Sequence, residues 1–385
     1  MGSRNTIEDL RGASRLAFEA SLGVTDLVQA MHLAIGEGPA LLGRPLHWPV
    51  RLFSGPIYDS IRGGMKRVGA GLDLSLARLA LRSVGPDMPG SKREALRAAL
   101  NGVLGDHLHE SGNPLAIEMS LRQAGQVGPR LLVLVHGSCG SDLQWARAGH
   151  EHGAALARDL GFTPVYLHYN SGLHISTNGR TFAGLLEQLV AAWPVPLEDF
   201  VILGHSMGGL VAQSACHYGQ KAEHSWREKL RKLVCLGTPH HGAPLERSGY
   251  WVHRLLELSR YSSPLARLGK IRSAGVTDLR YGNVLDEHWK GRDRFGGNTA
   301  RDVRKRLALP AGVQCYAAAA TLTPKGGRKL RGDGLVPVDS ALGRHQKPAL
   351  RLGFPETNQW IGHGMGHLDL LSRGEVYETL RGWLA

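Results

Sequence analysis

The feature that most restricts the fold of this chain is an apolar run that leads into a glycine-flanked serine and then into a second apolar run. Residues 201–211 read Val-Ile-Leu-Gly-His-Ser-Met-Gly-Gly-Leu-Val, which is the pattern G-x-S-x-G between a buried strand and a helix. Gly204 and Gly208 carry no Cβ atoms to crowd a sharp strand-to-helix turn, and such a turn holds Ser206 in a strained conformation. With His205 beside the serine, the motif predicts a nucleophile elbow in which Ser206 is the nucleophile.

From about residue 126 onward, short apolar runs alternate with helical patterns, which is typical of a mostly parallel sheet wrapped by helices. We expect strands at 131–135, 164–168, 200–203, 232–236 and 313–319, and more weakly at 349–352. We expect helices at 149–160, 181–193 and 207–218. Together with the elbow, this alternation predicts an α/β class protein with the α/β-hydrolase fold.

The chain before this region has a different pattern. Apolar residues recur at spacings of three and four in 10–22, 27–35 and 72–81, so residues 1–125 are predicted to form a helical extension that packs on the core. The basic, amphipathic stretch 66–82 fits packing on the main domain or, as the alternative, contact with a membrane surface. The remainder, 126–385, is the predicted catalytic domain.

One insertion interrupts the alternation of strands and helices. The stretch from 243 to about 310 is far longer than the loops of ordinary α/β units. Its first part is rich in Tyr, Trp and Leu, which would give a helix an apolar face over an active site. We therefore expect a helical cap or lid there, with an ordinary structural insertion as the alternative.

In such a sheet the acid and the base follow the serine in the chain order Ser, Asp or Glu, His. Asp333 lies on a Gly-Asp-Gly turn after the fifth predicted strand and is the expected acid, with Asp339 as the alternative. His367 is the expected base because it directly precedes the last apolar helical run, whereas His363 lies among glycines. In this interpretation His367 takes the proton of Ser206 and returns it to the leaving alcohol, while Asp333 fixes its tautomer.

A second motif follows the first predicted core strand and reads His-Gly-Ser-Cys-Gly from His136 onward. The His-Gly pair allows a tight turn, so His136 and Gly137 are candidate pocket residues. The backbone amides of Ser138 and Met207 are predicted to form an oxyanion hole, each worth roughly 3 kcal/mol of barrier. Cys139 is interpreted as a packing residue because a better nucleophile is present.

Composition restricts the classes of binding partner and the cellular compartment that we expect. The net charge of +13 implies attraction to polyanions. Nucleic acid is not expected, because no recognised motif or basic-aromatic pattern accompanies the charge, whereas peripheral contact with an anionic membrane surface stays open. Four widely spaced cysteines, the lack of an apolar leader and the lack of an apolar run of about 18 residues predict reduced thiols and a cytoplasmic protein.

The motifs resemble the bacterial lipase and esterase branch of the α/β-hydrolases, close to the PGAP1-like group related to GPI inositol-deacylases. The matching pieces are VHGSCGSDLQW (135–145), YNSGLHISTNGR (169–180), GHSMGGL (204–210), LGTPHHGAPLER (236–247), IRSAGVTDLRYGN (271–283) and GDGLVPVDSALG (332–343).

The resemblance implies hydrolysis of a small-molecule or lipid ester through an acyl-enzyme on Ser206, with His240 and His241 lining or shaping the pocket entrance. No organic cofactor is needed for this chemistry. No metal is expected, because adjacent histidines are poorly spaced for chelation. Two alternatives stay open: an acyltransferase with the same triad, and a non-enzymatic lipid-binding or scaffold protein that keeps the fold.

Overall fold

The computed structural model describes residues 90–243, 273–292, 304–327 and 330–385, together with 9, 11–16, 63, 66, 70 and 302. The chain divides into two units, one of Met1–Gly90 with Glu110–Ala116 and one of Ser91–His109 with Ile117–Ala385. The expected boundary near residue 125 differs from this division, because most of the helix α3 (Gly90–Glu110) belongs to the second unit. In the first unit, Asn113 Nδ2 donates to the Gly12 carbonyl at 3.0 Å.

Several predicted elements fall on residues that are not described. Residues 11–16 are helical, but the rest of the predicted helices at 10–22, 27–35 and 72–81 lie outside the described part of the chain. The same holds for most of the basic stretch 66–82 and for residues 244–272 and 293–301 of the predicted cap. No helix in the described residues is long and apolar enough to cross a membrane.

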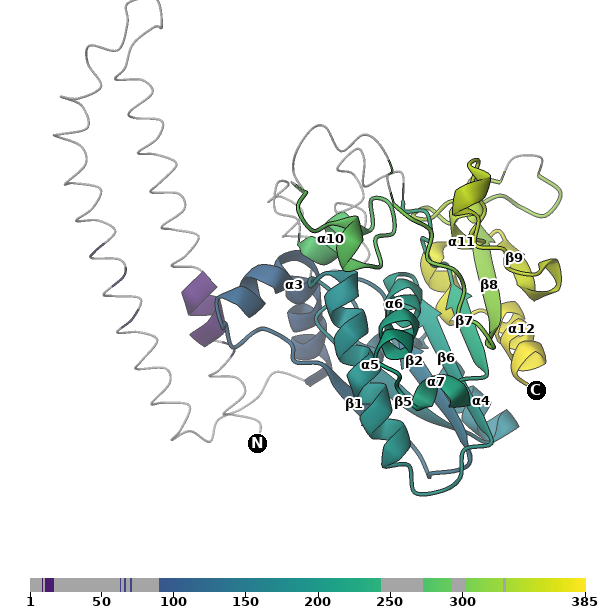
Figure 1. Ribbon diagram of the computed structural model, residues 1–385, viewed down its shortest axis with the longest axis horizontal. Helices are drawn as coiled ribbons and strands as arrows, with labels where there is room; N and C mark the ends of the chain where they lie inside the picture. Colours follow the sequence, from purple (N-terminus) through teal and green to yellow (C-terminus); the bar gives the residue numbers. More distant parts are fainter. Residues whose placement is uncertain are drawn as a thin grey trace, which may run out of the picture. The chain divides into compact units, whose positions relative to one another are not determined.

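The second unit is built on a seven-stranded sheet with the order β1-β5-β2-β6-β7-β8-β9 (Figure 1). The edge strand β1 runs antiparallel to β5, and all other neighbours are parallel. The strands are β1 (Ser120–Gln123), β2 (Arg130–Val135), β5 (Phe162–His168), β6 (Asp199–His205), β7 (Lys232–Leu236), β8 (Gln314–Thr321) and β9 (Gln359–His363). Two short strands, β3 (Ala146–Arg147) and β4 (His150–Glu151), pair separately.

Helices cover both faces of the sheet (Figure 1). In β2, for example, Val133 packs in the cluster that includes Phe182 and Leu210, whereas Leu134 packs in the cluster that includes Leu156 and Leu380. A strand buried on both faces must be apolar throughout, which explains the continuous runs in the sequence. The helices are α4 (His152–Leu160) and α12 (Gly374–Leu384) on one face, and α5 (Ile175–Ala191), α6 (Met207–Lys221) and α7 (Trp226–Lys229) on the other.

Short elements connect this framework. They are η2 (Asp142–Trp145), α10 (Ala274–Asp278), η4 (Asp286–His288), α11 (Val338–Ala341), η5 (Pro348–Leu350), η6 (Glu356–Asn358) and η7 (His367–Leu371), where η marks a 3₁₀ helix. All four cysteines are free, and Cys216, Cys235 and Cys315 are buried, as small core residues are expected to be.

Five of the predicted strands are confirmed, with small changes at their ends. The sixth, at 349–352, is wrong: a 3₁₀ helix covers part of it, and the last strand is β9, whose short apolar pair gives little signal. The edge strand β1 is missing from the prediction because its four residues are mostly polar and exposed. Helix α5 begins earlier than predicted, since the distant Asp278 accepts a hydrogen bond from the Ile175 amide at 3.0 Å and so caps the helix.

Helix α3 approaches the loops that follow β2 and β5 very closely. A Cβ atom at Gly102 would lie 2.3 Å from Cys139 Sγ, and one at Gly105 would lie 1.9 Å from Asn170 Oδ1. The Asn170 amide also donates to the Gly105 carbonyl at 2.8 Å. Glycine is therefore required at both helical positions, where it would otherwise weaken a helix.

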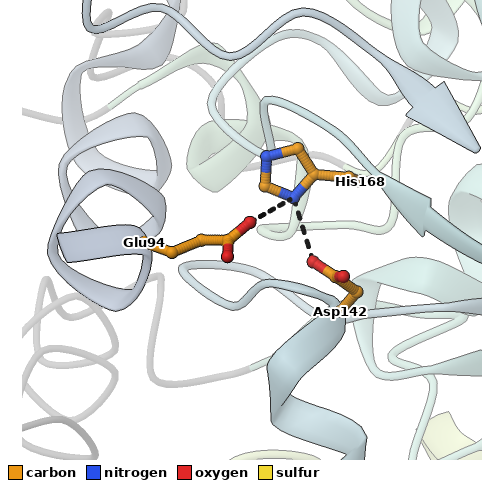
Figure 2. Close-up of side chains that lie close together, drawn as sticks. All are labelled: Glu94, Asp142 and His168. Carbon is orange, nitrogen blue, oxygen red and sulfur yellow. Dashed lines mark hydrogen bonds and ion pairs between the residues drawn. The ribbon is translucent and has the colours of Figure 1, made fainter. Parts of the chain in front are cut away.

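An ionic cluster joins α3 to the edge of the sheet (Figure 2). His168 Nδ1 lies 3.2 Å from Asp142 Oδ1 and 3.8 Å from Glu94 Oε1. Among the residues that the structure describes, these three form the one group of potential metal ligands with atoms within 4.8 Å of one another. Arg122 also contacts both carboxylates, at 3.0 Å from Asp142 Oδ2 and at close range from Glu94. The carboxylates thus already have cationic and donor partners, and the cluster is an ion-pair network.

The pKa of Asp142 reflects the positive charges and donors of this cluster. Burial by itself would raise the pKa of the Asp142 carboxyl, but the His168 hydrogen bond and the Arg122 charge outweigh it and lower the pKa to about 2. The carboxylate therefore stays ionised throughout the range in which the protein would be studied.

Candidate active site

Ser206 occupies the turn between β6 and α6 with φ 54° and ψ −124°. Positive φ is costly for a residue with a side chain, by about 1–3 kcal/mol, and must be imposed by the surroundings. A Cβ at Gly204 would lie 2.5 Å from the Gly209 nitrogen, and one at Gly208 would lie 2.2 Å from the Val135 carbonyl oxygen. Both glycines of the motif are therefore needed for the turn, and Ser206 lies at the carboxyl end of β6.

Asp333 and His367 lie in direct contact. His367 Nδ1 is 2.7 Å from Asp333 Oδ2, and the two side chains are 4% and 1% exposed. Asp333 Oδ1 accepts from the amides of Leu335 at 2.9 Å and Val336 at 2.7 Å. A carboxylate that accepts at Nδ1 places the hydrogen of a neutral imidazole there, so Nε2 presents its lone pair.

The loops that follow three neighbouring strands, β2, β6 and β7, lie next to Ser206 or to this pair. A Cβ atom added at Gly237, which follows β7, would lie 3.2 Å from His367 Cε1. One added at Gly137, which follows β2, would lie 3.1 Å from Ser206 Cβ. His205, next to Ser206 in the chain, places Nε2 3.2 Å from the His367 carbonyl. The carboxyl ends of parallel strands meet at one edge of a sheet, where ligands bind in α/β folds, and the three expected residues all lie at this edge.

The predicted oxyanion donors lie on the two loops expected of them. The Met207 amide is the first of α6 and so has no acceptor within its own helix. The Ser138 amide precedes Cys139, whose positive φ of 58° and hydrogen bond to Ser171 Oγ at 3.0 Å shape the loop. Within the described residues, neither the Ser138 nor the Met207 amide donates a hydrogen bond. Both amides are thus available to a bound ligand.

His136 is a buried residue that supports the loop. Its ring stacks on Tyr169 with the centroids 4.3 Å apart, and the Tyr169 hydroxyl donates to the His136 carbonyl at 2.8 Å. Burial, as the largest cause, lowers the pKa of His136 to about 4, so the ring is neutral at ordinary pH. Its position suits a structural role beside Gly137.

His240 and His241 lie on the loop after β7. His240 is buried, with Nδ1 3.1 Å from Gln213 Nε2, and His241 is half-buried, with its amide donating to Ser340 Oγ at 3.1 Å. Burial is the main cause that lowers the pKa of His240 to about 3 and that of His241 to about 4. Both line a small pocket with His288 and Arg304, and their place at the substrate entrance stays a prediction.

The alternative acid, Asp339, and the alternative base, His363, do not belong to the Asp333–His367 pair. Asp339 is exposed on α11, and His363 lies at the end of β9. Sequence reasoning missed Gly237, whose φ of 57° and proximity to His367 make it part of the site's wall. The signal for it is the glycine directly after the apolar strand in the piece LGTPHHG.

Comparison with known proteins agrees with this architecture. Residues 126–296 match the family model of the PGAP1-like alpha/beta domain, and the mostly parallel sheet with its edge strand is that of the α/β-hydrolase fold. No curated protein matches the chain.

Among solved structures, the mature Bacillus licheniformis lipase BlEst2 is similar at 16% identity and a TM-score of 0.46, over 69% of this chain and 98% of that one. The putative non-heme bromoperoxidase BpoC of Mycobacterium tuberculosis is similar at 16% identity and a TM-score of 0.40, over 70% and 95%. The Pyrococcus furiosus esterase Pf2001 is similar at 13% identity and a TM-score of 0.38, over 69% and 88%.

Proposed function

We propose that this chain is a serine hydrolase that cleaves carboxylic esters through Ser206, His367 and Asp333. The α/β-hydrolase fold supports ester hydrolysis in general. The observation that carries the proposal is the combination of a serine at positive φ after β6 with a buried imidazole whose Nδ1 lies 2.7 Å from a carboxylate oxygen. A residue pair that served the fold alone would not require the strained serine beside it.

In the proposed reaction, His367 Nε2 takes the proton of the Ser206 hydroxyl as its oxygen attacks the ester carbonyl. The amides of Ser138 and Met207 stabilise the resulting oxyanion. The imidazolium then gives its proton to the leaving alcohol, which leaves an acyl group on Ser206. A water molecule, deprotonated by the same imidazole, releases the acid and regenerates the serine. Asp333 holds the Nδ1 hydrogen throughout and stabilises the charged ring.

The test uses purified protein, p-nitrophenyl esters with acyl chains from two to sixteen carbons, and a fluorophosphonate label. Ser206→Ala is expected to abolish labelling and to lower kcat by about 10⁴-fold to 10⁶-fold. The matched control is Ser225→Ala, which removes an exposed hydroxyl and is expected to keep wild-type activity. The chain-length profile separates an esterase from a lipase.

Two outcomes would contradict the proposal. If a folded wild type neither reacts with the label nor hydrolyses any ester, the scaffold alternative is favoured. If Ser206→Ala keeps most of the activity, another residue is the nucleophile. Adding a competing alcohol tests the acyltransferase alternative, since acyl transfer would exceed hydrolysis only if the acceptor has its own binding site.

A further inference from the structure

A small pocket of about 30 Å³ lies between α6, which begins directly after the proposed nucleophile, and the loop after β7. It is bounded by α6, by the loop after β7, and by segments near η4 and before β8. Its polar lining includes Gln213, His240, His288, Arg304, Lys305 and Arg306. The proposed catalytic steps use none of these groups.

His240 lines this pocket and carries a ring nitrogen that is a hydrogen-bond donor. Gln213 Nε2 lies 3.1 Å from His240 Nδ1, and an amide nitrogen only donates, so Nδ1 accepts. The hydrogen of the neutral ring is therefore on Nε2. His240 is 4% exposed, and its Nε2 makes no hydrogen bond within the described part of the chain.

His288 has the same arrangement as His240, and the donor that faces its Nδ1 is a backbone amide. The backbone amide of Val284 donates to His288 Nδ1 at 3.2 Å, which again leaves the ring hydrogen on Nε2. His288 is 5% exposed, and its Nε2 makes no hydrogen bond of normal geometry among the described residues, with the Lys305 carbonyl as a nearby weak acceptor. Burial, followed by the charge of Arg304, lowers the pKa of His288 to about 4 against the opposing effect of the Lys305 carbonyl. The ring is neutral and cannot accept through Nε2.

Arg304 is fixed in the wall of the pocket, where Asp302 balances its charge. Its guanidinium is held by Asp302, with Nη2 2.7 Å from Oδ2, and by the carbonyls of His240 at 3.2 Å and Gly282 at 2.9 Å. Lys305 and Arg306 contribute positive charge to the lining, and no acidic side chain lines the pocket among the residues that the structure describes. Buried N–H groups without partners are rare and need an explanation, and here the matching ligand is an acceptor with negative charge.

We propose that this pocket binds the oxyanion group, a carboxylate or a phosphate, of an ester substrate cleaved at Ser206. This inference rests on the proposed function. A Cβ atom at Gly237 would lie 3.2 Å from His367 Cε1, and His240 follows three residues later, so the Cα atoms of Gly237 and His240 lie at most about 11 Å apart. The pocket has room for one or two oxygen-sized groups, so a carboxylate, or two oxygens of a larger phosphate, would enter it. The expected substrates are therefore esters that carry a small anionic group at a distance from the scissile carbonyl.

The binding test is independent of catalysis and uses the Ser206→Ala protein. Thermal unfolding is followed in acetate, in inorganic phosphate and in chloride at equal ionic strength. We expect acetate or phosphate to raise Tm by about 1–2 °C when its concentration is about ten times its Kd. The anion that raises Tm shows whether the site prefers a carboxylate or a phosphate. Adding His288→Leu or His240→Leu should remove the shift, whereas His109→Leu, at an exposed position, should keep it.

The substrate test compares p-nitrophenyl hydrogen suberate with p-nitrophenyl methyl suberate, which differ by one negative charge. Wild type should prefer the charged ester at least tenfold in kcat/KM, and a phosphate-bearing ester replaces it if phosphate is the anion that binds. The ratio should fall toward one in either leucine variant and stay at the wild-type value in His109→Leu.

Two outcomes would overturn the inference, and a third would separate it from the proposed function. The absence of any anion effect in folded Ser206→Ala protein would mean that the two N–H groups bind only water. Anion binding without a preference for the charged ester would remove the link to the substrate. Loss of all ester hydrolysis in wild type with the Tm shift intact would contradict the proposed function while keeping the anion site.

Discussion

Buried histidines in two parts of the second unit, His367 in one and His240 with His288 in the other, present opposite chemistry. His367 has a carboxylate at Nδ1, 2.7 Å away, so its Nε2 is a hydrogen-bond acceptor that can act as a base. His240 and His288 have N–H donors at Nδ1, at 3.1 Å and 3.2 Å, so their Nε2 atoms are donors. The same side chain is thus set as a base in one place and as an anion-binding group in the other by the atom that faces Nδ1.

A carboxylate partner alone does not define a base. His174 Nδ1 lies 2.9 Å from Asp278 Oδ2, yet the His174 ring stacks on Trp289 with centroids 3.6 Å apart, and Asp278 also caps helix α5. That pair serves the fold. What distinguishes His367 is its position after β9, beside the elbow that carries Ser206.

The change with the largest expected effect makes His367 resemble His240. Asp333→Asn keeps the shape of the side chain but lets its amide donate to Nδ1, which moves the ring hydrogen to Nε2 and removes the base. We expect kcat to fall by about 10⁴-fold, since the wrong tautomer has this effect in a serine protease triad. Hydrolysis of p-nitrophenyl acetate at neutral pH measures it.

The matched control is Asp339→Asn, which makes the same chemical change at an exposed carboxylate in the same part of the chain. It is expected to retain wild-type kcat. A large loss in this control, together with a small loss in Asp333→Asn, would reverse the assignment of the acid and with it the comparison of the two sets of histidines.

The sequence predicts the site around His367 but not the tautomers of His240 and His288. The elbow is predictable because its glycines, its serine and the flanking runs are contiguous, and Asp333 and His367 follow from chain order. The tautomers of His240 and His288 depend on Gln213 and Val284, and the pairing of Gln213 with His240 spans 27 residues. No local pattern encodes such contacts. The cap of α5 by Asp278, 103 residues from Ile175, escapes prediction for the same reason.

A second change tests how tightly the His367 ring is held. Gly237→Ala adds a methyl group 2.8 Å from Leu370 Cδ1 and 3.2 Å from His367 Cε1, so the Leu370 side chain must move and the His367 ring must give by a few tenths of an ångström. A displacement of this kind costs about 10-fold to 100-fold in kcat. The control is Gly312→Ala, which has φ 74° and nothing within 4 Å of the added atom.

Both glycine variants carry the backbone cost of positive φ, about 1–2 kcal/mol. Urea unfolding should therefore show a loss of stability in both, while kcat falls in Gly237→Ala alone. Equal kcat values in the two variants would mean that the wall beside His367 can relax, and that the position of the base is less restricted than its contacts indicate.

The smallest expected effect concerns stability and pH. Burial lowers the pKa of His240 to about 3, whereas an unfolded histidine titrates near 6.5. Below about pH 6.5 the unfolded chain therefore binds a proton that the folded chain does not. Folding stability is complete above that pH and falls as the pH decreases toward the folded pKa, by up to about 1.4 kcal/mol per pH unit for one such histidine.

Urea unfolding followed by tryptophan fluorescence between pH 7.5 and 5 measures this slope. His240→Leu removes one titrating group and should reduce the slope by up to one proton, while the surface control His109→Leu should not. An unchanged slope in His240→Leu would show that the His240 ring takes up its proton over the same pH range in the folded and the unfolded protein. Its Nε2 would still donate, but the contrast with His367 would then rest on charge rather than on the tautomer set by Gln213.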